Sequence, residues 1–490
     1  MRRTLSVYYV NPVHESATMF ARPRLLAPLV VLLLVTLPVH VSAAPASSEV
    51  LVVGGTPAGV AAAVAAAREG ASVTLAVRGS MLGGILTDGM MDQWDLNLAP
   101  GGGTIQGGIF TEVHARLGDS FTPQAAASTF AALVASEPRI TVRTGLLPAS
   151  AKVVTDGDGR RVRGVAFAGA DGRRTTILAD EVIDATDNGD VAFLAGARFD
   201  LGRQDTGRDE RTQAVTLMFA IRDVDWSQVA ASYDPAHDGP GGATARRAWG
   251  YSTLLAGYVP LSNDVLVRDL NLGRESSGGV TVNAIDVLGI DGLRVDDRAR
   301  ARALSEREAP HLIAYLRTRI PGFESASVDR FASALYVRET RHFAGLERLQ
   351  AGDVWSGRVT SDAIGLSSYP LDLHPSVRDE RLAYAPVRHV YGVPLGTLVP
   401  QGFLNLVLAS PSISASHIAA GSARVIPTTI EEGEAAGIVC ALARRDRRPL
   451  ADYVRDEHAF NVLRERLTAR GVVLPLQAAY GVRSSGATRA

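Results

Sequence analysis

The chain has 490 residues, of which 46% are hydrophobic and 21% are charged. This balance is typical of a globular protein large enough for two or three domains, and it excludes a disordered chain or a protein with many membrane spans. The 50 basic and 51 acidic residues almost cancel, and the sequence has no concentrated basic stripe. Nucleic acid is therefore not an expected partner.

The N-terminal segment has the pattern of a secretory signal peptide. Arg22 and Arg24 precede an apolar run at residues 25–41, and small residues follow at 42–44. We expect residues 1–44 to be removed and the protein to be exported, periplasmic or extracellular, with no stable membrane association. An uncleaved anchor is the alternative, but the run contains two prolines and is short for a span of ~20 residues.

The sequence contains a single cysteine, Cys440. One cysteine excludes an internal disulfide and any cysteine-based metal site, including an iron–sulfur cluster, and we predict no metal site. Cys440 lies in an alanine-rich helical pattern, which favours a buried, inert thiol over a reactive one.

A dinucleotide-binding pattern follows the proposed signal peptide. An apolar run at residues 49–53 leads into a turn containing Gly54, Gly55 and Gly59, then into an alanine-rich helical segment ending at residue 69 and a second apolar run at 72–77. Strand, glycine turn, helix and strand form the start of a βαβ unit. Glycines let the backbone approach a pyrophosphate, and the helix N-terminus offers free N–H groups and partial positive charge.

Two positions depart from that pattern. Thr56 stands where the middle glycine of G-x-G-x-x-G is usual, and Val77-Arg78 stand where an acidic residue would bind a ribose hydroxyl. By itself the turn is equally compatible with an ordinary strand-to-helix connection.

A glycine-rich stretch follows the second predicted strand and includes Gly83, Gly84, Thr87 and Gly89. With this L-G-G-x-x-T-x-G stretch, the sequence resembles the FAD-dependent oxidoreductases that have a glutathione-reductase-like FAD domain. It is most similar to a branch of bacterial flavoproteins, some of which carry the label xanthan lyase. The resemblance extends over residues 49–470, and it implies FAD as the cofactor rather than a nicotinamide.

The next segments predict helices at 107–117 and 123–134, a strand at 140–142 and a β-meander at 151–168. The apolar strand that follows ends in Ala185 and Thr186, with Asp190 four residues later. In the family this I-D-A-T-x-x-G-D stretch faces the cofactor, which implies that Ala185, Thr186 and Asp190 contact FAD. A hairpin tip with solvated acids is the alternative reading of the same residues.

Residues 196–385 change in composition, and the resemblance implies an inserted substrate-facing lid here. Within it, residues 234–248 predict an exposed or mobile loop because they are rich in Gly, Pro and Asp. An R-E-T-R motif contains Arg338 and is followed by His342. On a strand, Arg338, Thr340 and His342 would share a face, whereas on a helix Arg338, Arg341 and His342 would. These cations would bind a substrate or offset charge on a reduced flavin, or form a structural salt bridge with Glu339. His374 alternates with Asp372 on a predicted strand and is a further candidate for the same cavity.

The last block matches the family most densely. The S-A-S-H-x-A-x-G-S-x-R-V-x-P-T stretch includes Ser414, Ser416, His417, Arg424 and Thr428. A helix is predicted from Thr428 or Thr429 to residue 444, with Glu431 and Glu432 in its first turn. In the family this helix N-terminus points at the flavin, which implies cofactor contacts from Ser414, Ser416, Arg424, Thr428 and Thr429. The two positions before Ser412, commonly Gly-Arg in relatives, are Ser410-Pro411 here.

His417 is the main candidate for acid–base catalysis, because imidazole titrates near neutral pH and the motif lies near the flavin. A structural histidine and a covalent flavin attachment point are the alternatives. Arg338, His342 and His374 are the other catalytic candidates.

We therefore predict an α/β protein whose Rossmann-like, bipartite FAD-binding domain contains an inserted mixed α+β substrate or lid domain. The expected parts are a signal peptide at 1–44, the FAD domain at 45–197 and 386–490, and the insert at 198–385. The expected activity is hydride transfer from a polar, possibly carbohydrate-related small molecule to the flavin, with an unidentified electron acceptor such as a quinone, a small carrier or oxygen. A degenerate flavin-binding module without activity is the alternative, and an NAD-dependent dehydrogenase is a third reading that Gly83, Gly84 and the last block disfavour.

Overall fold

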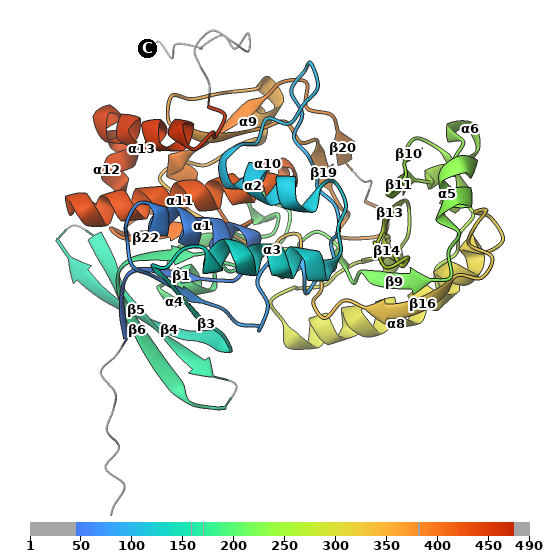
Figure 1. Cartoon of the computed structure of the whole chain (residues 1–490), viewed down its shortest axis with the longest axis horizontal. Coiled ribbons are helices and arrows are strands. Elements are labelled where there is room, and N and C mark those ends of the chain that lie inside the picture. The colour runs from blue at the N-terminus through green and yellow to red at the C-terminus, as the bar shows by residue number, and fades with distance from the viewer. Residues whose placement is uncertain (1–45, 158, 170, 381–382, 475–490) are drawn as a thin grey trace, which may run out of the picture. The chain divides into compact units, whose positions relative to one another are not determined.

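The computed structural model describes residues 46–157, 159–169, 171–380 and 383–474 (Figure 1). The proposed signal peptide at 1–44 lies outside these residues. Within them, no helix is both long and apolar enough to cross a membrane.

A seven-stranded sheet forms the centre of the larger half of the protein, around the first hydrophobic core. Its strands, in spatial order, are β3 (Ile140–Arg143), β2 (Val73–Ala76), β1 (Ala46–Val53), β6 (Arg174–Asp184), β5 (Gly159–Gly169) and β4 (Leu146–Asp156), with β22 (Leu406–Leu408) also paired to β6. β1 is parallel to β2 and β6, and β22 is parallel to β6. Residues 50–53 of β1 are buried, as expected for a central parallel strand covered on both faces.

The register brings three strand ends together. Val53 of β1 and Leu408 of β22 both lie opposite Asp184 of β6. The segments that follow these strands therefore leave the sheet at one edge, at the carboxyl ends of parallel strands, where open α/β sheets bind their ligands.

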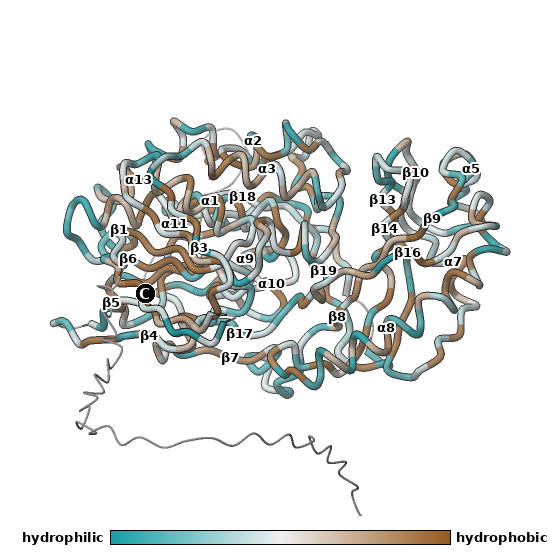
Figure 2. The backbone as a smooth tube through the Cα atoms, turned by 60° about the horizontal axis from the view of Figure 1, so that its bottom comes forward, coloured by the Kyte–Doolittle hydropathy of each residue, from teal (hydrophilic) through white to brown (hydrophobic). Residues whose placement is uncertain are grey.

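Helices α1 (Pro57–Arg68) and α11 (Ile426–Asp446) lie side by side over the large sheet (Figure 1). A Cβ atom on Gly433 would collide with the carbonyl oxygen of Ala58, and one on Gly437 with that of Ala62. Glycine at these two positions therefore permits backbone-to-backbone contact between the helices. Figure 2 shows the hydrophobic colour concentrated on β1, β6 and the segments around them, and Cys440 on α11 is buried, as predicted.

The start of α11, predicted at Thr428 or Thr429, lies two or three residues earlier. The helix begins at Ile426, with Val425 at the N-cap and no side-chain cap. The first turn of a helix tolerates Pro427 because the backbone nitrogen at that position needs no hydrogen bond. Glu431 and Glu432 consequently lie in the second turn rather than the first.

The remaining helices of this half flank the sheet and the C-terminal segment. They are α2 (Gly108–Leu117), α3 (Pro123–Ala135), α4 (Asp190–Leu194), α9 (Ala351–Ser356), α10 (His417–Ala423), α12 (Leu450–Arg455) and α13 (Glu457–Ala469), with 3-10 turns η1 (Gly84–Leu86), η2 (Gln204–Thr206) and η3 (Leu395–Thr397). Short antiparallel pairs complete it: β7 (Phe199–Leu201) with β17 (Arg341–Phe343), β18 (Ala363–Ser367) with β21 (Tyr391–Pro394), and β19 (Leu371–Leu373) with β20 (Ala383–Ala385).

A second hydrophobic core contains buried residues between Val215 and Ala326. Its six-stranded antiparallel sheet has the order β10 (Gly242–Ala243), β11 (Arg247–Gly250), β13 (Leu270–Arg274), β14 (Val280–Asn283), β9 (Phe219–Arg222) and β16 (Ser327–Phe331). The other elements are β8 (Val215–Thr216), β12 (Val265–Leu266), β15 (Asp286–Val287), α5 (Trp226–Ser232), α6 (Pro235–Asp238), α7 (Ser252–Leu255) and α8 (Val295–Leu316). This is the mixed α+β insert of the predicted fold class, and its boundaries at 198 and 385 remain a prediction.

The segment at 234–248, predicted as an exposed or mobile loop, contains regular structure. Asp234 caps α6 by accepting from the amide of Ala236, and β10 pairs with β11. Gly239 adopts a φ of +99°, and its carbonyl accepts a hydrogen bond from the Tyr233 hydroxyl. Most of the segment is exposed, as predicted, but its glycines form tight turns in a hairpin instead of a mobile linker.

Three glutamates of α11 are buried. Glu431 accepts from the amide of Gly107 and Glu434 from that of Ile109, so both bind the N-terminus of α2. Neither carboxylate oxygen of Glu432 has a partner among the described residues. Burial raises the pKa of Glu431 and Glu432 well above the usual range and raises the pKa of Glu434 to about 7.

We predict that the stability of the Glu434→Gln variant decreases less with rising pH than the stability of the wild type. The folded state holds a proton on Glu434 up to a pKa of about 7, whereas an unfolded glutamate releases it near 4.5. The contribution of Glu434 to the free energy of unfolding is therefore complete below pH 4.5. About 3 kcal/mol of it is lost as the pH rises to 7. Thermal unfolding at pH 5 and pH 8 would show a smaller decrease in melting temperature for Glu434→Gln than for the wild type. The exposed Glu465→Gln on α13 is the control, and equal decreases in all three proteins would contradict the prediction.

Candidate active site

The turn after β1 has the geometry of a pyrophosphate cradle. Gly54 has a φ of +123°, and a Cβ atom there would collide with the carbonyl of Ala185 at the end of β6. A Cβ on Gly59 would collide with the carbonyl of Gly54, and one on Gly55 would lie 2.6 Å from Cγ1 of Val77. Side chains are thus excluded at the three predicted glycine positions.

Thr56 is compatible with this cradle although glycine is usual at its position. Its hydroxyl donates to the carbonyl of Ala185 at 2.9 Å and accepts from the amide of Gly59 at 3.1 Å, which caps α1. The amides of Gly55, Thr56 and Ala58 donate to no described group. These N–H groups at the N-terminus of a 12-residue helix can bind phosphate oxygens.

The L-G-G stretch packs directly on the cradle. The amide of Gly83 donates to the carbonyl of Gly55 at 2.7 Å, and a Cβ on Gly84 would lie 3.3 Å from Cα of Thr56. Thr87 is buried and its hydroxyl donates to the carbonyl of Gly84. Val77 contacts Gly55 where a ribose-binding acid would be usual, so that carboxylate is missing from the end of β2.

The turn after β6 is organised by its own polar side chains. Asp184 is buried and accepts from the Thr186 hydroxyl at 2.7 Å, and Thr186 in turn accepts from the amide of Asp190 at 2.7 Å. Burial raises the pKa of Asp184 to about 6. Asp190 also pairs with Arg341 of the R-E-T-R motif at 3.2 Å. The structure places Ala185, Thr186 and Asp190 beside the glycine turn, with Thr186 and Asp190 already bonded to protein groups.

The last sequence block reaches the same region. Ser416 caps α10, Ser414 is buried, Thr428 accepts from the side-chain amide of Asn97 at 3.2 Å, and Thr429 donates to the carbonyl of Ile426. The hydroxyls of Ser416, Thr428 and Thr429 are thus engaged within the protein, whereas the buried Ser414 hydroxyl has no partner among the described residues. The N-terminus of α11, however, has no side-chain cap, so its partial positive charge is available to an anionic group such as a reduced flavin ring.

Directly before that N-terminus, Arg424 lies in a polar cluster. Its guanidinium donates to Asp372 at 2.9 Å and to the Tyr336 hydroxyl. Asp372 is 3.5 Å from Nε2 of His374, whose Nδ1 is 2.7 Å from Asp286.

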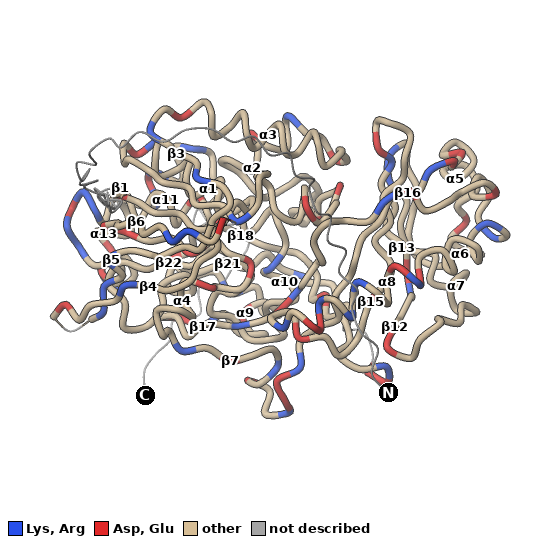
Figure 3. The backbone as a smooth tube through the Cα atoms, turned by 90° about the horizontal axis from the view of Figure 1, so that it is seen from below, with Lys and Arg blue, Asp and Glu red and all other residues tan. Residues whose placement is uncertain are grey.

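A second arginine closes this circuit. Arg338 is 3.4 Å from Asp286 and lies over the Tyr336 ring, 4.6 Å from its centroid. We call the six residues of this closed circuit the Arg424 ring; they are Arg424, Asp372, His374, Asp286, Arg338 and Tyr336. Its positive and negative groups alternate, and Figure 3 shows the same interspersed pattern of basic and acidic residues along the chain.

The Arg424 ring fixes the charge state of its members. Although burial opposes their ionisation, His374 and the arginines hold the pKa values of Asp286 and Asp372 well below the usual range. Burial and Arg338 oppose the charged imidazole, yet the two carboxylates raise the pKa of His374. The two carboxylates, one facing each ring nitrogen, thus favour the charged form of His374.

Two further groups border the ring. Burial raises the pKa of Asp95, an effect that Arg424 and the Tyr369 hydroxyl partly offset. Asp95 and Tyr369 remain partly solvent-accessible, as do Tyr336, Asp372 and His374. The ring thus presents carboxylate and phenol groups to the solvent side, while its arginines are buried.

A second cluster contains the other two predicted catalytic histidines. Oε1 of Glu339 lies 2.7 Å from Nε2 of His342 and 2.7 Å from Nδ1 of His417. Oε2 of Glu339 accepts from the amide of Gln213, whose side-chain oxygen accepts from the amide of His374. Gln213 therefore connects the two clusters.

The R-E-T-R motif is extended and leads into β17, but its side chains diverge. Arg338 binds the Thr216 hydroxyl and approaches Asp286, whereas Thr340 and Arg341 bind Asn188 and His342 binds Glu339. The structure thus brings Arg338 together with His374, and His342 together with His417. Sequence reasoning assigned no role to Asp95, Asp286, Tyr336, Tyr369 or Gln213. Tyr336 and Tyr369 had a local signal, because each begins a family-like stretch, whereas the other three are isolated in sequence.

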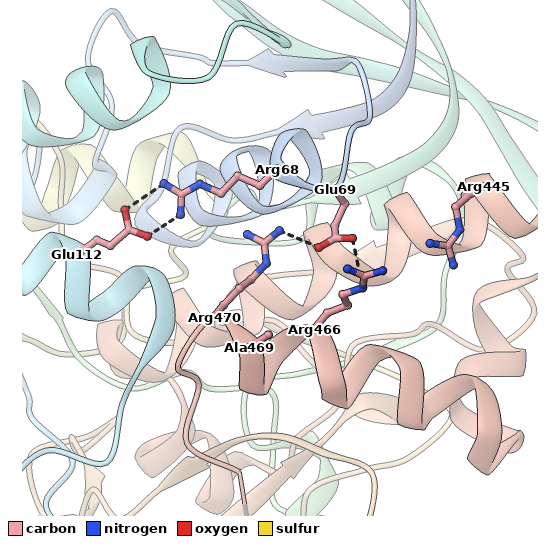
Figure 4. A pocket seen from close by; sticks show the side chains of 7 residues that line it. All are labelled: Arg68, Glu69, Glu112, Arg445, Arg466, Ala469 and Arg470. Carbon is pink, nitrogen blue, oxygen red and sulfur yellow. Dashed lines mark hydrogen bonds and ion pairs between the residues drawn. The ribbon is translucent and has the colours of Figure 1, made fainter.

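A separate polar pocket of about 630 Å³ lies near the C-terminal ends of α1, α11 and α13 (Figure 4). Arg466 and Arg470 converge there on Glu69, and Arg68 binds Glu112. Arg68 lies in the last turn of α1, where a cation stabilises the helix dipole. The charges in this pocket are paired, and the pocket contains none of the predicted site residues.

A glycine turn completed by the ends of β6 and α11, with polar clusters beside it, defines an enzyme with a Rossmann-type cofactor site. The family model described as FAD dependent oxidoreductase matches residues 49–467, and the chain belongs to this family. It is an FAD-dependent oxidoreductase, as predicted, and the residues of the cradle fit that cofactor. A search among curated proteins finds no match.

Solved structures resemble the chain over most of its length. The p-nitrophenol 4-monooxygenase from Pseudomonas putida has a TM-score of 0.44 at 12% identity, covering 87% of this chain and 89% of that one. A flavoprotein/dehydrogenase from Cytophaga hutchinsonii has a TM-score of 0.42 at 12% identity, covering 86% of each chain. A geranylgeranyl bacteriochlorophyll reductase-like protein from Thermoplasma acidophilum has a TM-score of 0.40 at 14% identity, covering 87% of each chain.

We predict that Gly54→Ala removes bound flavin. Alanine would have to adopt a φ of +123° and would collide with Ala185, which displaces either the glycine turn or the end of β6. The measurement is the visible absorbance of purified protein lacking residues 1–44, with the chromophore identified after heat release. Gly352→Ala in α9, where a Cβ meets no atom within 4 Å, is the control. A folded Gly54→Ala protein with full flavin content would show that the turn is not the cradle.

Proposed function

We propose that this enzyme oxidises a neutral, hydroxyl-bearing small molecule, such as a carbohydrate, by hydride transfer from carbon to the flavin. Bound FAD would supply the two-electron chemistry, and the protein would bind, orient and deprotonate the substrate. Export is part of this proposal, on the pattern of residues 1–44, as is an external electron acceptor such as a quinone, a small carrier or oxygen.

The observation that supports this function best is the Arg424 ring at the uncapped N-terminus of α11. Arg424 immediately precedes the N-cap of that helix, which places the ring beside the end of the cofactor site. The ring's partly accessible phenol and carboxylate groups can donate to and accept from substrate hydroxyls.

The charge balance of the ring favours a neutral substrate. Arg424 is paired with Asp372 and Arg338 with Asp286, and Nε of each guanidinium, which has no partner among the described residues, is buried, so neither is placed to bind a substrate carboxylate. Asp95 borders the same ring and adds a further acidic side chain rather than a cation that could pair with an anion. A sugar or polyol hydroxyl satisfies these acceptors without adding charge.

The proposed proton acceptor is His417, because its Nε2 alone among the histidine nitrogens of the two clusters is both accessible and uncommitted. His374 is bonded through both nitrogens, and Nδ1 of His342 is buried. The side chain of His417 is 12% exposed, and its Nε2 bonds to no described group. A neutral Nε2 can accept the hydroxyl proton as hydride leaves the adjacent carbon.

A substrate screen tests the proposed substrate class. Sugars and polyols should bleach the flavin absorbance of the holoenzyme under anaerobic conditions, and aldonic or uronic acids of the same size should reduce it more slowly because of Asp95 and the paired arginines. Reduction by the carboxylated compounds alone would contradict the proposal.

We predict that His417→Asn slows flavin reduction by ~10²- to 10⁴-fold, the usual contribution of a general base. Asparagine can retain the donor near the position of Nδ1, so the bond to Glu339 survives while the accepting nitrogen is lost. Stopped-flow reduction measures the rate, and flavin content should not change. His458→Asn, exposed on α13, is the control. Wild-type reduction rates in His417→Asn would assign the proton transfer to another group.

A further inference from the structure

The carboxylate of Glu339 is shared by two imidazoles at equal distance. Nε2 of His342 and Nδ1 of His417 both lie 2.7 Å from Oε1, and the amide of Gln213 donates to Oε2 at 3.0 Å. The Glu339 side chain has no exposed surface. A buried carboxylate that accepts three hydrogen bonds is held in one orientation, and it can only accept.

Since Glu339 can only accept, both nitrogens that face it must bear hydrogen. The tautomer of His417 is then determined: Nδ1 is the donor, and the neutral ring has its lone pair on Nε2. For His342 the donor is Nε2, and a proton on its buried Nδ1 would have no acceptor among the described residues.

We propose that Glu339 is a positioning residue, which fixes the Nδ1–H tautomer of His417 and divides its stabilising charge between His417 and His342. This inference rests on the proposed role of His417 as the proton acceptor. His342 then acts through Glu339 and has no contact with the substrate. Glu339 of the R-E-T-R motif thus serves the proton transfer, while its neighbours Arg338 and Thr340 hold other parts of the site.

The surroundings of His417 leave Glu339 as its dominant ionic partner. Asp205 accepts from the backbone amide of His417, and Arg203 lies nearby. The charged groups on the elements around α10 are themselves paired: Asp205 with Arg348, Arg203 with Asp209, Asp372 with Arg424, and Asp353 with Arg358. Although burial lowers it, the hydrogen bond and charge of Glu339 raise the pKa of His417, and the imidazole donors hold the pKa of Glu339 at about 2 in spite of burial.

Two substitutions should move the titration of His417 in opposite directions. Glu339→Gln removes the charge and should lower the pKa of His417 by ~1 unit or more, as expected for loss of an opposite charge in contact. His342→Leu removes the competing donor and should raise it. The measurement is NMR titration of the holoenzyme labelled at histidine Cε1, with the His417 signal assigned from its absence in His417→Asn.

Kinetics provide a second readout. In Glu339→Gln the acid limb of the pH profile for flavin reduction should move to lower pH by the same amount as the NMR titration, and Glu339→Asp, which keeps the charge, should restore much of the wild-type profile. An unchanged His417 titration in Glu339→Gln, or shifts of the same sign in both variants, would overturn the inference. If both titrations shift as expected while His417→Asn reduces flavin at the normal rate, the positioning holds and the proposed catalytic role of His417 fails.

Discussion

The alignment of three strand ends is the constraint on which the rest of this structure depends. Val53, Asp184 and Leu408 lie in register across β1, β6 and β22, so the segments after them leave the sheet at one point although about 350 residues separate the first from the last. The contact of Gly433 with the Ala58 backbone then sets the distance between α11 and α1. A bulkier residue there would separate the uncapped N-terminus of α11 from the cradle and, with it, Arg424 from the cofactor end of the site.

Buried charge organises the region beyond that point. Asp286 and Glu339 are buried, Asp372 is only partly accessible, and each contacts at least one guanidinium or imidazole. Removing one member of such a pair leaves an uncompensated buried charge, which typically costs about 3–5 kcal/mol. The residues that orient a substrate are therefore also residues that stabilise the fold here. For this reason loss of activity alone is a poor guide to their role, and spectroscopic or titration measurements are more informative.

The large sheet and its glycine turn could be predicted from the sequence, because strand, turn and helix periods are local and Gly54 and Gly59 mark the places where the backbone is crowded. Other features depend on tertiary partners. The hairpin at 234–248 looked like a loop because its order comes from pairing with distant strands. The start of α11 was placed late because threonines suggested a cap, whereas Val425 occupies the N-cap. Asp286 on β15 and Gln213, just before β8, could not be identified from the sequence because their partners Arg338 and Glu339 are more than 50 residues away along the chain.

The two histidine environments show why proximity to a flavin site does not by itself identify a base. His374 directly follows β19 and His417 begins α10, two elements that contact each other, and each histidine contacts a buried carboxylate. His374 has a carboxylate at each nitrogen, which favours the doubly protonated ring and leaves no lone pair to accept a proton. His417 has a carboxylate at one nitrogen only, so it can alternate between neutral and charged forms while Nδ1 stays bonded. The number of carboxylates around each imidazole thus distinguishes the two histidines. His374, with two, can hold the Arg424 ring together as a cation, whereas His417, with one, is able to exchange a proton.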